Sequence, residues 1–391
     1  GLHKRLAQRD ITYPELGSGQ HKEYFSRLNR ELEVIGNIKG ADAEFLVAAN
    51  CVTWANNNGI MSGPGRSAAP GSLVAYSLGV TDIDPLRYGL LFERFIHSDN
   101  IELPTFFLDF SADRYREVSE YATAFASNHK DGKNRYFIDY SEGMYEKSNL
   151  LRREITASGD TDDIFHYISA SPILTLIDSC QKQIRESGGS EFDIRMVRDD
   201  DAETLAVLSS VDFKGLLTNS AELHDCLWKV RPTDFEQLVA SIALCSPHFI
   251  ESGIFDEFVR QKHGSVALLE SELLHPSLYN TSGILIYQEQ LMNLISRAAG
   301  YTMNKVDYLR KVMGRKDANK IMHEQEMFIN ACRTMGVSEE NAGKLFQWLV
   351  DSAVGLQMKA HSAGEGISIY RMAYLKTHFP ELPYLTDLLL R

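Results

Sequence analysis

The sequence lacks the features that mark a secreted, membrane-bound or disulfide-bonded protein. Its five cysteines are scattered, without the CxxC or CxxH spacing of a zinc site or a disulfide framework. No apolar run approaches the roughly 18 residues that a membrane-spanning helix needs, and the opening residues GLHKRLAQRD lack the apolar core of a signal peptide. These absences predict a globular protein of a reducing, cytoplasmic compartment, with no membrane partner.

Positive charge is also scarce. The 391 residues carry 40 Lys and Arg against 53 Asp and Glu, which gives a formal net charge of −13. Such a surface repels nucleic acid over most of its area, so a polyanion could bind only at a local basic patch. The charge therefore argues against a protein that coats DNA, but it is compatible with a DNA-reading cleft.

Apolar residues recur at helical spacing along much of the chain, whose length allows two or three packed domains. The first clear case is the segment 22–36, which ends at a glycine, a common signal for the end of a helix. The apolar face predicted for this helix consists of Phe25, Leu28, Leu32 and Ile35.

Later segments predict further elements. Helices are predicted at 43–58, 72–78, 287–299, 302–315, 338–351 and 366–378, and a capping-box pattern at 233–236 opens another. A strand is predicted within 91–110, which is rich in Phe, Ile and Leu. Residues 125–165 are polar and predict an irregular connection, with a domain boundary near 165–175.

The segment GPGRSAAPGS, residues 63–72, is a glycine-rich loop that leads into a predicted helix. Backbone N–H groups in such a loop attract phosphate oxygens, above all at a helix N-terminus. Arg66 could donate two N–H groups to a phosphate, and Ser72 could donate its hydroxyl. Such loops are more often plain helix entries, and this one lacks the Gly-Lys-Ser/Thr ending of a Walker loop.

Residues 301–320 form a locally basic segment, with six Lys and Arg against two Asp. The predicted buried stripe is Val306, Leu309 and Met313, and another face carries Tyr308, Lys311 and Arg315. Basic side chains beside an aromatic ring suit phosphate contacts together with stacking on a base or sugar. A solvated helix face is the alternative interpretation.

A third candidate segment is GLQMKAHSAGEG, residues 355–366, just before a predicted helix. Lys359, His361 and Ser362 are crowded between its glycines. A lone histidine in such a place is usually structural. Lys359 near a helix start is more informative, because it would meet an anionic ligand held at that end.

Six blocks, in this order along the chain, resemble the α subunit of bacterial DNA polymerase III, the C-family replicative polymerase. They are GPGRSAAPGSLVAYSLGVTDIDPLRYGLLFERF at 63–95, DFEQLVASIAL at 234–244, FVRQKHG at 258–264, GILIYQEQLM at 283–292, LRKVMGRK at 309–316 and KAHSAGEGISIYRMAYLKTHFP at 359–380. The resemblance spans most of the chain, and its motifs are specific.

The resemblance implies an α+β, mostly helical fold, with a polymerase-β-like palm on a mixed sheet, a large helical fingers domain and a thumb that is reduced or absent. It assigns 1–124 to the N-terminal part of the palm and 125–165 to an irregular connection in place of the thumb. It assigns 166–180 to the end of the palm and 181–391 to the fingers.

In this family three palm acids hold two magnesium ions, which activate the primer hydroxyl and neutralise charge on the nucleotide phosphates. Two of the acids belong to a strand motif Pro-Asp-Phe-Asp-x-Asp-Phe, which reads PTFFLDF here. Thr105 and Phe107 occupy the two metal-binding places, and Asp109 matches the last acid of the motif. The third metal ligand aligns with Tyr167. The resemblance therefore implies a palm motif that has lost its metal ligands.

Other departures agree. The family's Gly-Arg-Gly-Ser reads Gly-Arg-Ser-Ala at 65–68, which removes a glycine and a hydroxyl, and Pro70 removes a further N–H. The arginine expected four residues before the proline of the motif is Asn100. The chain between Asp109 and Asp178 is also much shorter than the family pattern.

Two sets of residues keep family positions. Arg66, Ser72, Lys359 and His361 match positions near the incoming triphosphate, and the predicted DNA-binding residues are Tyr308, Arg310, Lys311, Arg315 and Lys316. No cofactor is expected, and magnesium is expected only if the protein still polymerises.

The leading hypothesis is an inactive palm and fingers protein with a DNA-associated or structural role in replication or repair. It would bind DNA weakly and without sequence preference, and it could contact replication or repair proteins. One alternative is an active DNA polymerase with displaced ligands, for which Asp109, Asp113 and Glu117 or the acidic run at 198–203 are candidates. Another is a protein-interaction scaffold without DNA binding.

Overall fold

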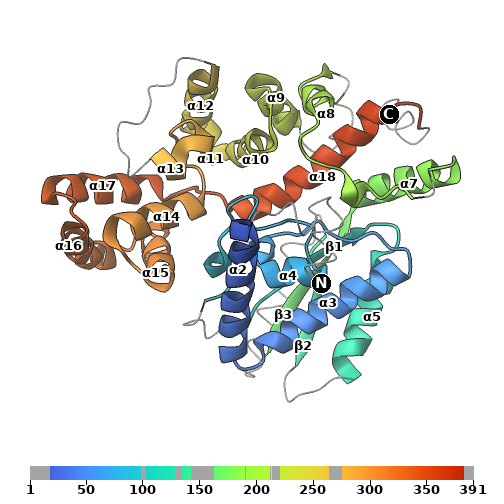
Figure 1. Ribbon diagram of the computed structural model, residues 1–391, viewed down its shortest axis with the longest axis horizontal. Helices are drawn as coiled ribbons and strands as arrows, with labels where there is room; N and C mark the ends of the chain where they lie inside the picture. Colours follow the sequence, from blue (N-terminus) through green and yellow to red (C-terminus); the bar gives the residue numbers. More distant parts are fainter. Residues whose placement is uncertain are drawn as a thin grey trace. The chain divides into compact units, whose positions relative to one another are not determined.

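The computed structural model describes residues 18–97, 103–128, 134–141, 163–189, 191–211, 213, 221–263 and 275–382. The chain forms two compact units (Figure 1). The first comprises Gly1–Thr204 together with Ile367–Arg391, and the second is Leu205–Gly366. Within the described residues, no helix is both long enough and apolar enough to cross a bilayer.

A three-stranded sheet lies at the centre of the first unit (Figure 1). Its strands are β1 (Phe107–Ser111), β2 (Arg135–Asp139) and β3 (Ile164–Ser171), in the order β1-β3-β2. Both strand pairs are parallel, and antiparallel pairing is limited, among the described residues, to an isolated bridge between Ser62 and Phe110. The sheet is thus less mixed than the sequence predicts.

One face of the sheet packs on helices α3 (Ala41–Asn57) and α5 (Tyr115–Asn128). Successive side chains of a strand point to opposite faces, so every second residue of β1 and β3 enters this core. Buried members of the cluster include Phe45, Phe106, Leu108, Phe110, Val118 and Ile168. The apolar run around β1 is therefore explained by this core.

A buried ion cluster lies on the same side of the sheet. The Glu44 carboxylate accepts bonds from Arg135 at 2.8 Å and from His166 at 3.0 Å. Burial alone would raise the pKa of Glu44, but the bonds from His166 and Arg135 outweigh it and lower that pKa. His166 is held in place because its Nδ1 accepts the Phe106 N–H at 3.3 Å.

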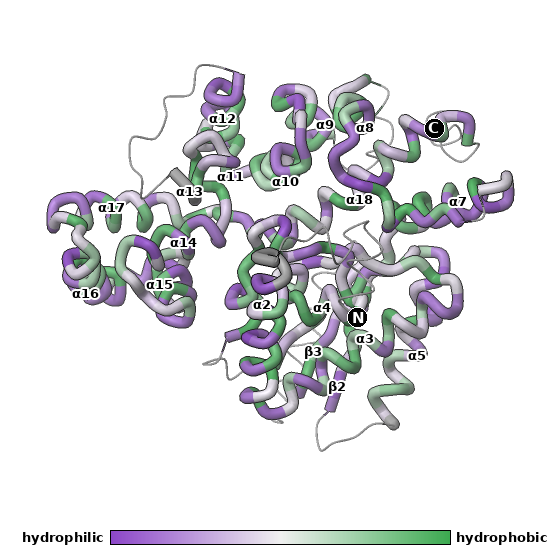
Figure 2. Tube along the Cα trace, in the orientation of Figure 1, coloured by the Kyte–Doolittle hydropathy of each residue, from purple (hydrophilic) through white to green (hydrophobic). Residues whose placement is uncertain are grey.

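Helix α2 (Ser18–Asn37) differs from the predicted amphipathic pattern at two positions. In Figure 2 hydrophilic and hydrophobic residues alternate around it. Leu32, predicted to be buried, is 49% exposed, whereas Glu31 is fully buried and lies with Tyr24 and Ile35 on the inner face. The prediction for Leu32 was wrong because position 31, not 32, faces inward, where the Glu31 carboxylate binds the start of a neighbouring helix. Leu32 lies next to it on the solvent side.

The predicted irregular connection at 125–165 contains regular structure. Helix α5 extends to Asn128, β2 spans Arg135–Asp139, and β3 begins at Ile164. Cross-strand pairing with β3 stabilises β2 despite its polar sequence context. The rest of the connection, at 129–133 and 142–162, and Asn100 lie outside the described residues.

The remaining helices of the first unit are short or peripheral. They are α4 (Leu73–Leu78) and α7 (Pro172–Glu186), with the single turns η1 (Ala69–Gly71), η2 (Phe92–Arg94) and η3 (Ile194–Met196). Helix α4 confirms the helix predicted at 72–78, and Ser72 is its N-cap.

The described part of the second unit is helical. Its elements are α9 (Ala221–Val230), α10 (Phe235–Leu244), α11 (Pro247–Glu251), α12 (Ile254–His263), α13 (His275–Leu278), η5 (Tyr279–Thr281), α14 (Gln288–Ala299), α15 (Met303–Gly314), α16 (Ala318–Thr334) and α17 (Glu339–Ser352). The cap of α10 is Asp234, one residue later than the predicted capping box begins. Helices α8 (Ala202–Val207) and α18 (Lys359–His378) span the boundaries between the units.

Helix α18 begins at Lys359, seven residues before the predicted start at 366, so the later part of the segment 355–366 is helical. Its glycines do not break it because Gly366 packs against a neighbouring helix. A Cβ at Gly366 would lie 3.3 Å from the Phe235 ring. Close packing thus outweighs the low helix propensity of glycine.

The compact units do not coincide with the palm and fingers division predicted at 181. Helix α7 and the residues up to Thr204 belong to the first unit, and so does the end of the chain from Ile367. The units differ from the predicted division because the chain from Ile367 onward belongs to the first unit and bonds to its residues. Tyr370 of α18 accepts the Asp201 N–H at 2.9 Å, and Arg371 pairs with Asp82 at 3.1 Å.

Candidate functional site

Aromatic rings occupy the sheet face opposite the α3 and α5 core. Phe107 of β1 lies directly across from Tyr167 of β3, and the two rings stack with centroids 4.5 Å apart and planes 11° apart. Tyr140 meets both rings edge-on, at 5.4 Å from Phe107 and 5.2 Å from Tyr167. Ile138 and Phe165 complete this buried cluster. We call Phe107, Tyr140 and Tyr167 the aromatic trio.

The aromatic trio includes two of the three positions at which the family resemblance places metal-binding acids. A divalent cation such as magnesium requires several oxygen ligands, and the Phe107 ring supplies none. The third position, Thr105, lies in extended backbone just before β1. Across the described ranges, no group of three or more His, Cys, Asp or Glu side chains is arranged to hold a metal ion.

The acid that remains, Asp109, is bound inside the protein. Its Oδ1 pairs with the Arg66 guanidinium at 3.3 Å, and the same guanidinium nitrogen donates to the Ser169 hydroxyl at 3.2 Å. Burial raises the pKa of Asp109, and the positive charge of Arg66 opposes that rise. Arg66 also lies over the Tyr140 ring at 5.5 Å. Arg66, which was predicted to bind a phosphate, is thus paired with Asp109, the one acid of the strand motif.

The glycine-rich loop positions Arg66 beside the sheet. The Gly63 N–H donates to the Asp109 carbonyl at 3.1 Å, which fixes the loop against β1. Gly65 has a φ of 125°, and a Cβ there would lie 2.9 Å from the Thr81 side chain, so the loop needs glycine at this place.

Four of the other acids that were candidates for displaced ligands have partners of their own. Glu117 pairs with Arg114 at 2.8 Å on the exposed side of α5. In the acidic run, Asp200 pairs with Arg198 at 2.5 Å, and Asp199 accepts bonds from Arg87 and Tyr88. Asp201 accepts bonds from Thr204 and His378, which lower its pKa to about 2. These carboxylates serve as ion-pair and capping groups.

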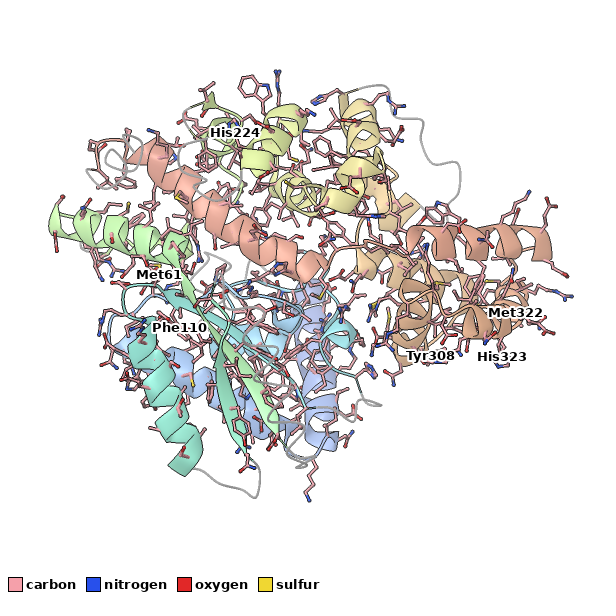
Figure 3. The ribbon with its side chains drawn as sticks, turned by 180° about the vertical axis from the view of Figure 1, so that it is seen from behind. Met61, Phe110, His224, Tyr308, Met322 and His323 are labelled. Atoms are coloured by element: carbon pink, nitrogen blue, oxygen red, sulfur yellow. The ribbon has the colours of Figure 1, made fainter. Side chains whose placement is uncertain are left out.

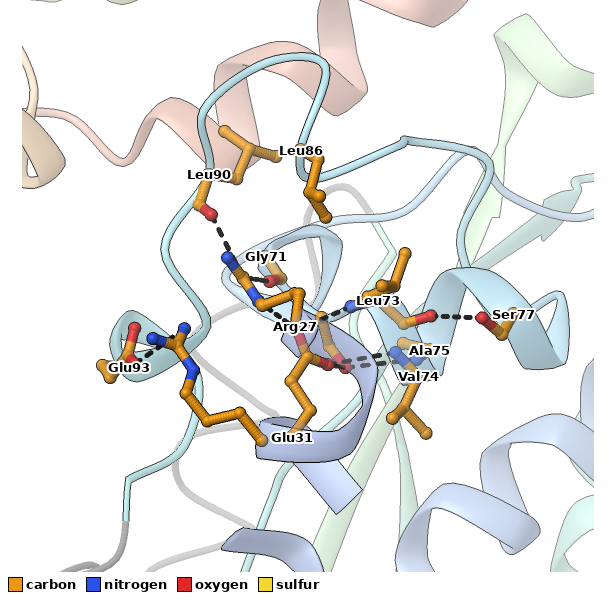
Figure 4. Close-up of polar contacts among 12 residues, drawn as sticks. Arg27, Glu31, Gly71, Leu73, Val74, Ala75, Ser77, Leu86, Leu90 and Glu93 are labelled. Carbon is orange, nitrogen blue, oxygen red and sulfur yellow. Dashed lines mark hydrogen bonds and ion pairs between the residues drawn. The ribbon is translucent and has the colours of Figure 1, made fainter. Parts of the chain in front are cut away.

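The N-terminus of α4, where a phosphate was predicted, is occupied by a carboxylate of the protein (Figure 4). Glu31 accepts the Ser72 hydroxyl at 2.8 Å and the N–H groups of Leu73 and Val74 at 3.0 Å each. Arg27 binds the same carboxylate at 2.5 Å and also donates to the Gly71 carbonyl at 2.7 Å. Ser72 is fully buried and is engaged with Glu31 rather than facing a ligand.

The N-terminus of α18 shows the same arrangement. The buried Glu289 carboxylate accepts the N–H groups of Lys359 at 3.0 Å and Ala360 at 3.3 Å. The Lys359 ammonium pairs with Glu236 at 2.8 Å. His361 lies half-buried in the first turns of the helix. An internal carboxylate thus holds each of the two helix starts that the sequence suggested for an anionic ligand.

The two parts of the predicted nucleotide pocket lie in different units. Arg66 and Ser72 belong to the first, and Lys359 and His361 belong to the second. Sequence reasoning missed Glu31 and Glu289. The sequence did carry a signal for Glu31, because this acid lies at helical spacing from the apolar residues on the buried face of α2. A carboxylate on such a face needs hydrogen-bond donors nearby.

The basic segment forms α15 and part of the turn after it. Asp307 is buried and binds both Arg310 at 2.8 Å and Lys311 at 2.7 Å. The Arg310 side chain is only 13% exposed and also donates to Gln288 at 3.3 Å, so it connects α15 to α14. The prediction that Arg310 faces DNA therefore conflicts with its burial.

The other predicted DNA-binding residues of this segment point to solvent. Tyr308 is 42% exposed (Figure 3), and the Lys305 ammonium lies 4.9 Å from its ring centroid. Arg315 and Lys316 at the end of α15 are exposed, and neither side chain makes an ion pair with a described residue. These groups remain accessible to a polyanion.

Comparison with known proteins accounts for this combination of sheet and helices. Residues 1–151 match the family profile described as the bacterial DNA polymerase III alpha NTPase domain, and residues 173–336 match the bacterial DNA polymerase III alpha subunit finger domain. The second match extends from α7 to α16.

Curated relatives carry the name DNA polymerase III subunit alpha. The protein of Pseudomonas aeruginosa is 28% identical over 461 aligned positions, which cover 91% of this chain and 39% of the relative. That of Thermus aquaticus is 27% identical over 450 positions, covering 90% of this chain and 37% of the relative. The protein of Helicobacter pylori is 27% identical over 485 positions, covering 97% and 39%.

The chain spans about two fifths of the length of these relatives. The alignments are also longer than the 391 residues of the chain, so the relatives contain residues within the aligned region that this chain lacks. With matches to two successive domains of one family and relatives aligned along nearly its whole length, the chain is a divergent homologue of the bacterial DNA polymerase III α subunits.

Proposed function

We propose that this protein is a DNA-associated accessory or structural protein of replication or repair that does not catalyse nucleotidyl transfer. The aromatic trio carries this proposal. Two-metal catalysis needs carboxylates that hold two cations about 3.5 to 4 Å apart. Here stacked rings stand at two ligand positions, and the remaining acid is paired with Arg66.

The ion pair with Arg66 also makes it unfavourable for Asp109 to bind a single metal ion. To bind a cation, Asp109 would have to release Arg66, which would leave a partly buried guanidinium without its counter-ion. The aromatic trio would also have to open to admit water and phosphate oxygens. Both changes cost free energy that one carboxylate cannot recover.

Retained DNA binding is supported by the end of α15. Arg315, Lys316 and the exposed Tyr308 can contact phosphates and a base, and they need no metal to do so. Binding of this kind is weak, indifferent to sequence and steeply reduced by salt. The net charge of −13 confines it to such local patches.

Primer extension tests the loss of catalysis. The purified protein is mixed with a primed template, deoxynucleotides and magnesium, and an active polymerase of the family serves as the positive control. We expect no extension. Template-dependent extension that Asp109→Asn abolishes would refute the proposal and would establish the active-polymerase alternative.

Nucleotide binding gives a second test. The α4 N-terminus already holds Glu31, and the α18 N-terminus already holds Glu289, so a triphosphate finds neither helix start open. We expect affinity no tighter than high micromolar in calorimetry, with no increase when magnesium is added. A low-micromolar, magnesium-dependent site would contradict this expectation. A protein that binds neither nucleotide nor DNA would favour the scaffold alternative.

A further inference from the structure

A second exposed aromatic ring with cations around it lies at the end of α9, away from the basic segment in sequence. The buried residues of α9 are Leu223, His224, Cys226, Leu227 and Val230. Trp228 lies outside this stripe and is 44% exposed. Indole rings usually bury most of their surface, and exposed ones are enriched at sites of recognition.

Arg231 follows directly after α9 and lies against this ring. Its guanidinium carbon is 5.9 Å from the Trp228 ring centroid, and the side chain makes no ion pair with any described residue. Its backbone is left-handed, with a φ of 49°, at a place after a helix where glycine is usual. A strained arginine at such a position suggests that its side chain has a role.

The other cations at this end separate into capping groups and exposed groups. Lys262 of α12 donates to the carbonyls of Val230 at 2.5 Å and Arg231 at 2.6 Å, and burial lowers its pKa to about 8. His263 donates to the Lys229 carbonyl at 3.1 Å. Both therefore satisfy the last carbonyls of α9. Lys229 and Arg231 do not. Both residues are exposed, and the Lys229 ammonium lies 5.5 Å from the Phe255 ring centroid.

The end of α15 shares two of these features, a left-handed cation after the helix and an exposed aromatic ring on it. Lys316 has a φ of 52° and follows the helix that carries the exposed Tyr308. Of the four non-glycine residues with positive φ in the described parts of the chain, two are thus exposed cations just after a helix with an exposed aromatic ring. This recurrence favours the interpretation that both helix ends bind the same kind of ligand.

We infer that Trp228, Lys229 and Arg231 form a binding site for single-stranded nucleic acid. A base stacks on the exposed indole face, and the two cations bind the adjoining phosphates. Stacking requires an unpaired base, so the site distinguishes single strands from duplex. The exposed Asp225, one turn earlier on α9, repels phosphate and limits the affinity. The site lies apart from α15 and does not depend on whether the palm is inactive.

An end-labelled oligothymidylate tests the stacking. Trp228→Ala should weaken its binding about fivefold to a hundredfold, and Trp228→Phe should retain most of the affinity. The chain has three tryptophans. Oligothymidylate should quench tryptophan fluorescence in the wild-type protein and in the control Trp348→Phe, but quenching should be absent in Trp228→Phe.

Arg231→Gly tests the charge without threatening the fold, because glycine adopts the left-handed backbone without strain. We expect lower affinity and a salt dependence flatter by about 0.7, because the variant neutralises one phosphate fewer on the single strand. Unchanged affinity in both Trp228→Ala and Arg231→Gly, or no binding of oligothymidylate by the wild type, would overturn the inference. An equal reduction for duplex and single strand would also overturn it, whereas the primer-extension result bears only on catalysis.

Discussion

The sheet face of the first unit and the helix ends of the second unit use their charges in opposite ways. On the sheet face, Asp109 and Arg66 neutralise each other beside the aromatic trio. At the ends of α9 and α15, Arg231 and Arg315 stay exposed and make no ion pair with a described residue. The charges of the first region are bound internally, and the second region presents charge that a polyanion can reach.

The difference follows from burial. A charge on the sheet face is partly desolvated, so it needs an internal partner. A charge at a helix end is solvated and costs little whether or not a ligand is bound. The sheet face therefore satisfies its charges internally, whereas the helix ends present charge that a ligand can reach.

The largest expected effect comes from removing the carboxylate that fills the α4 N-terminus. Glu31→Ala should lower the free energy of unfolding by about 3 to 5 kcal/mol, because it leaves Arg27 and two backbone N–H groups without their acceptor. The matched control is Glu33→Ala, on the exposed side of α2, which should change it by less than about 0.5 kcal/mol. Urea unfolding measures both.

Inorganic phosphate sharpens this test. If the α4 N-terminus is an anion site that Glu31 has filled, phosphate should stabilise Glu31→Ala more than it stabilises the wild type. Equal stabilisation of both proteins would show that the site admits no external anion.

Phe107→Asp tests whether a second carboxylate on the sheet face allows the protein to bind magnesium. Loss of the stacked ring and burial of a carboxylate should lower the free energy of unfolding by about 2 to 4 kcal/mol. We expect the melting temperature of the variant to be the same with magnesium as with a chelator, because a second carboxylate beside Asp109 still faces Arg66. Phe107→Leu is the control, and a magnesium-dependent rise seen only in Phe107→Asp would break the comparison between the two regions.

The cations of α15 should divide by burial. Arg315→Ala should weaken binding to a labelled primed duplex and flatten its salt slope by about one unit. Lys311→Ala should do the same less strongly, because Asp307 already holds that ammonium. Arg310→Ala should instead lower thermal stability and leave affinity nearly unchanged. Fluorescence anisotropy measures binding, and Arg333→Ala on α16 is an exposed control. A larger binding loss in Arg310→Ala than in Arg315→Ala would contradict this order.

The smallest effect concerns pH. The pKa of Asp109 is raised in the folded protein, so the folded state holds its proton more tightly than the unfolded state. Its contribution to stability is therefore greatest below the ordinary value of 3.8 and declines as pH rises through the raised pKa. Asp109→Asn removes this decline, so its melting temperature relative to wild type should rise between acidic and neutral pH. A difference that stays constant would show that Asp109 is not perturbed.

Some features followed from local sequence. The apolar spacing of α14, α15 and α17 predicted these helices to within one or two residues, because each buries a stripe against its neighbours. The Pro-Thr-Phe-Phe-Leu-Asp-Phe segment was also readable as a strand. The start of α18 at Lys359 was not predicted, since the helix was expected to begin at 366; Gly366 lies within the helix and packs on Phe235.

The candidate site likewise has some features that the sequence predicts and others that only the fold determines. Thr105, Phe107 and Tyr167 can be read from the sequence at the places where the family has acids, and they predict a palm motif without those ligands. The stack of Phe107 on Tyr167 could not be predicted, since β1 and β3 are far apart in sequence and meet through strand pairing. The same holds for the bond from Arg66 to Asp109.

Helical periodicity, the family and the chemical group at each position can all be read from the chain alone, because they depend on single residues or on residues close together in sequence. Which charges are used internally depends instead on long-range packing. Glu31 and Glu289 reach helix starts 42 and 70 residues away, and Asp307 withdraws Arg310 while Arg315 stays exposed. The physical reason is that desolvation, which determines whether a charge needs a partner, arises from the packing of distant segments.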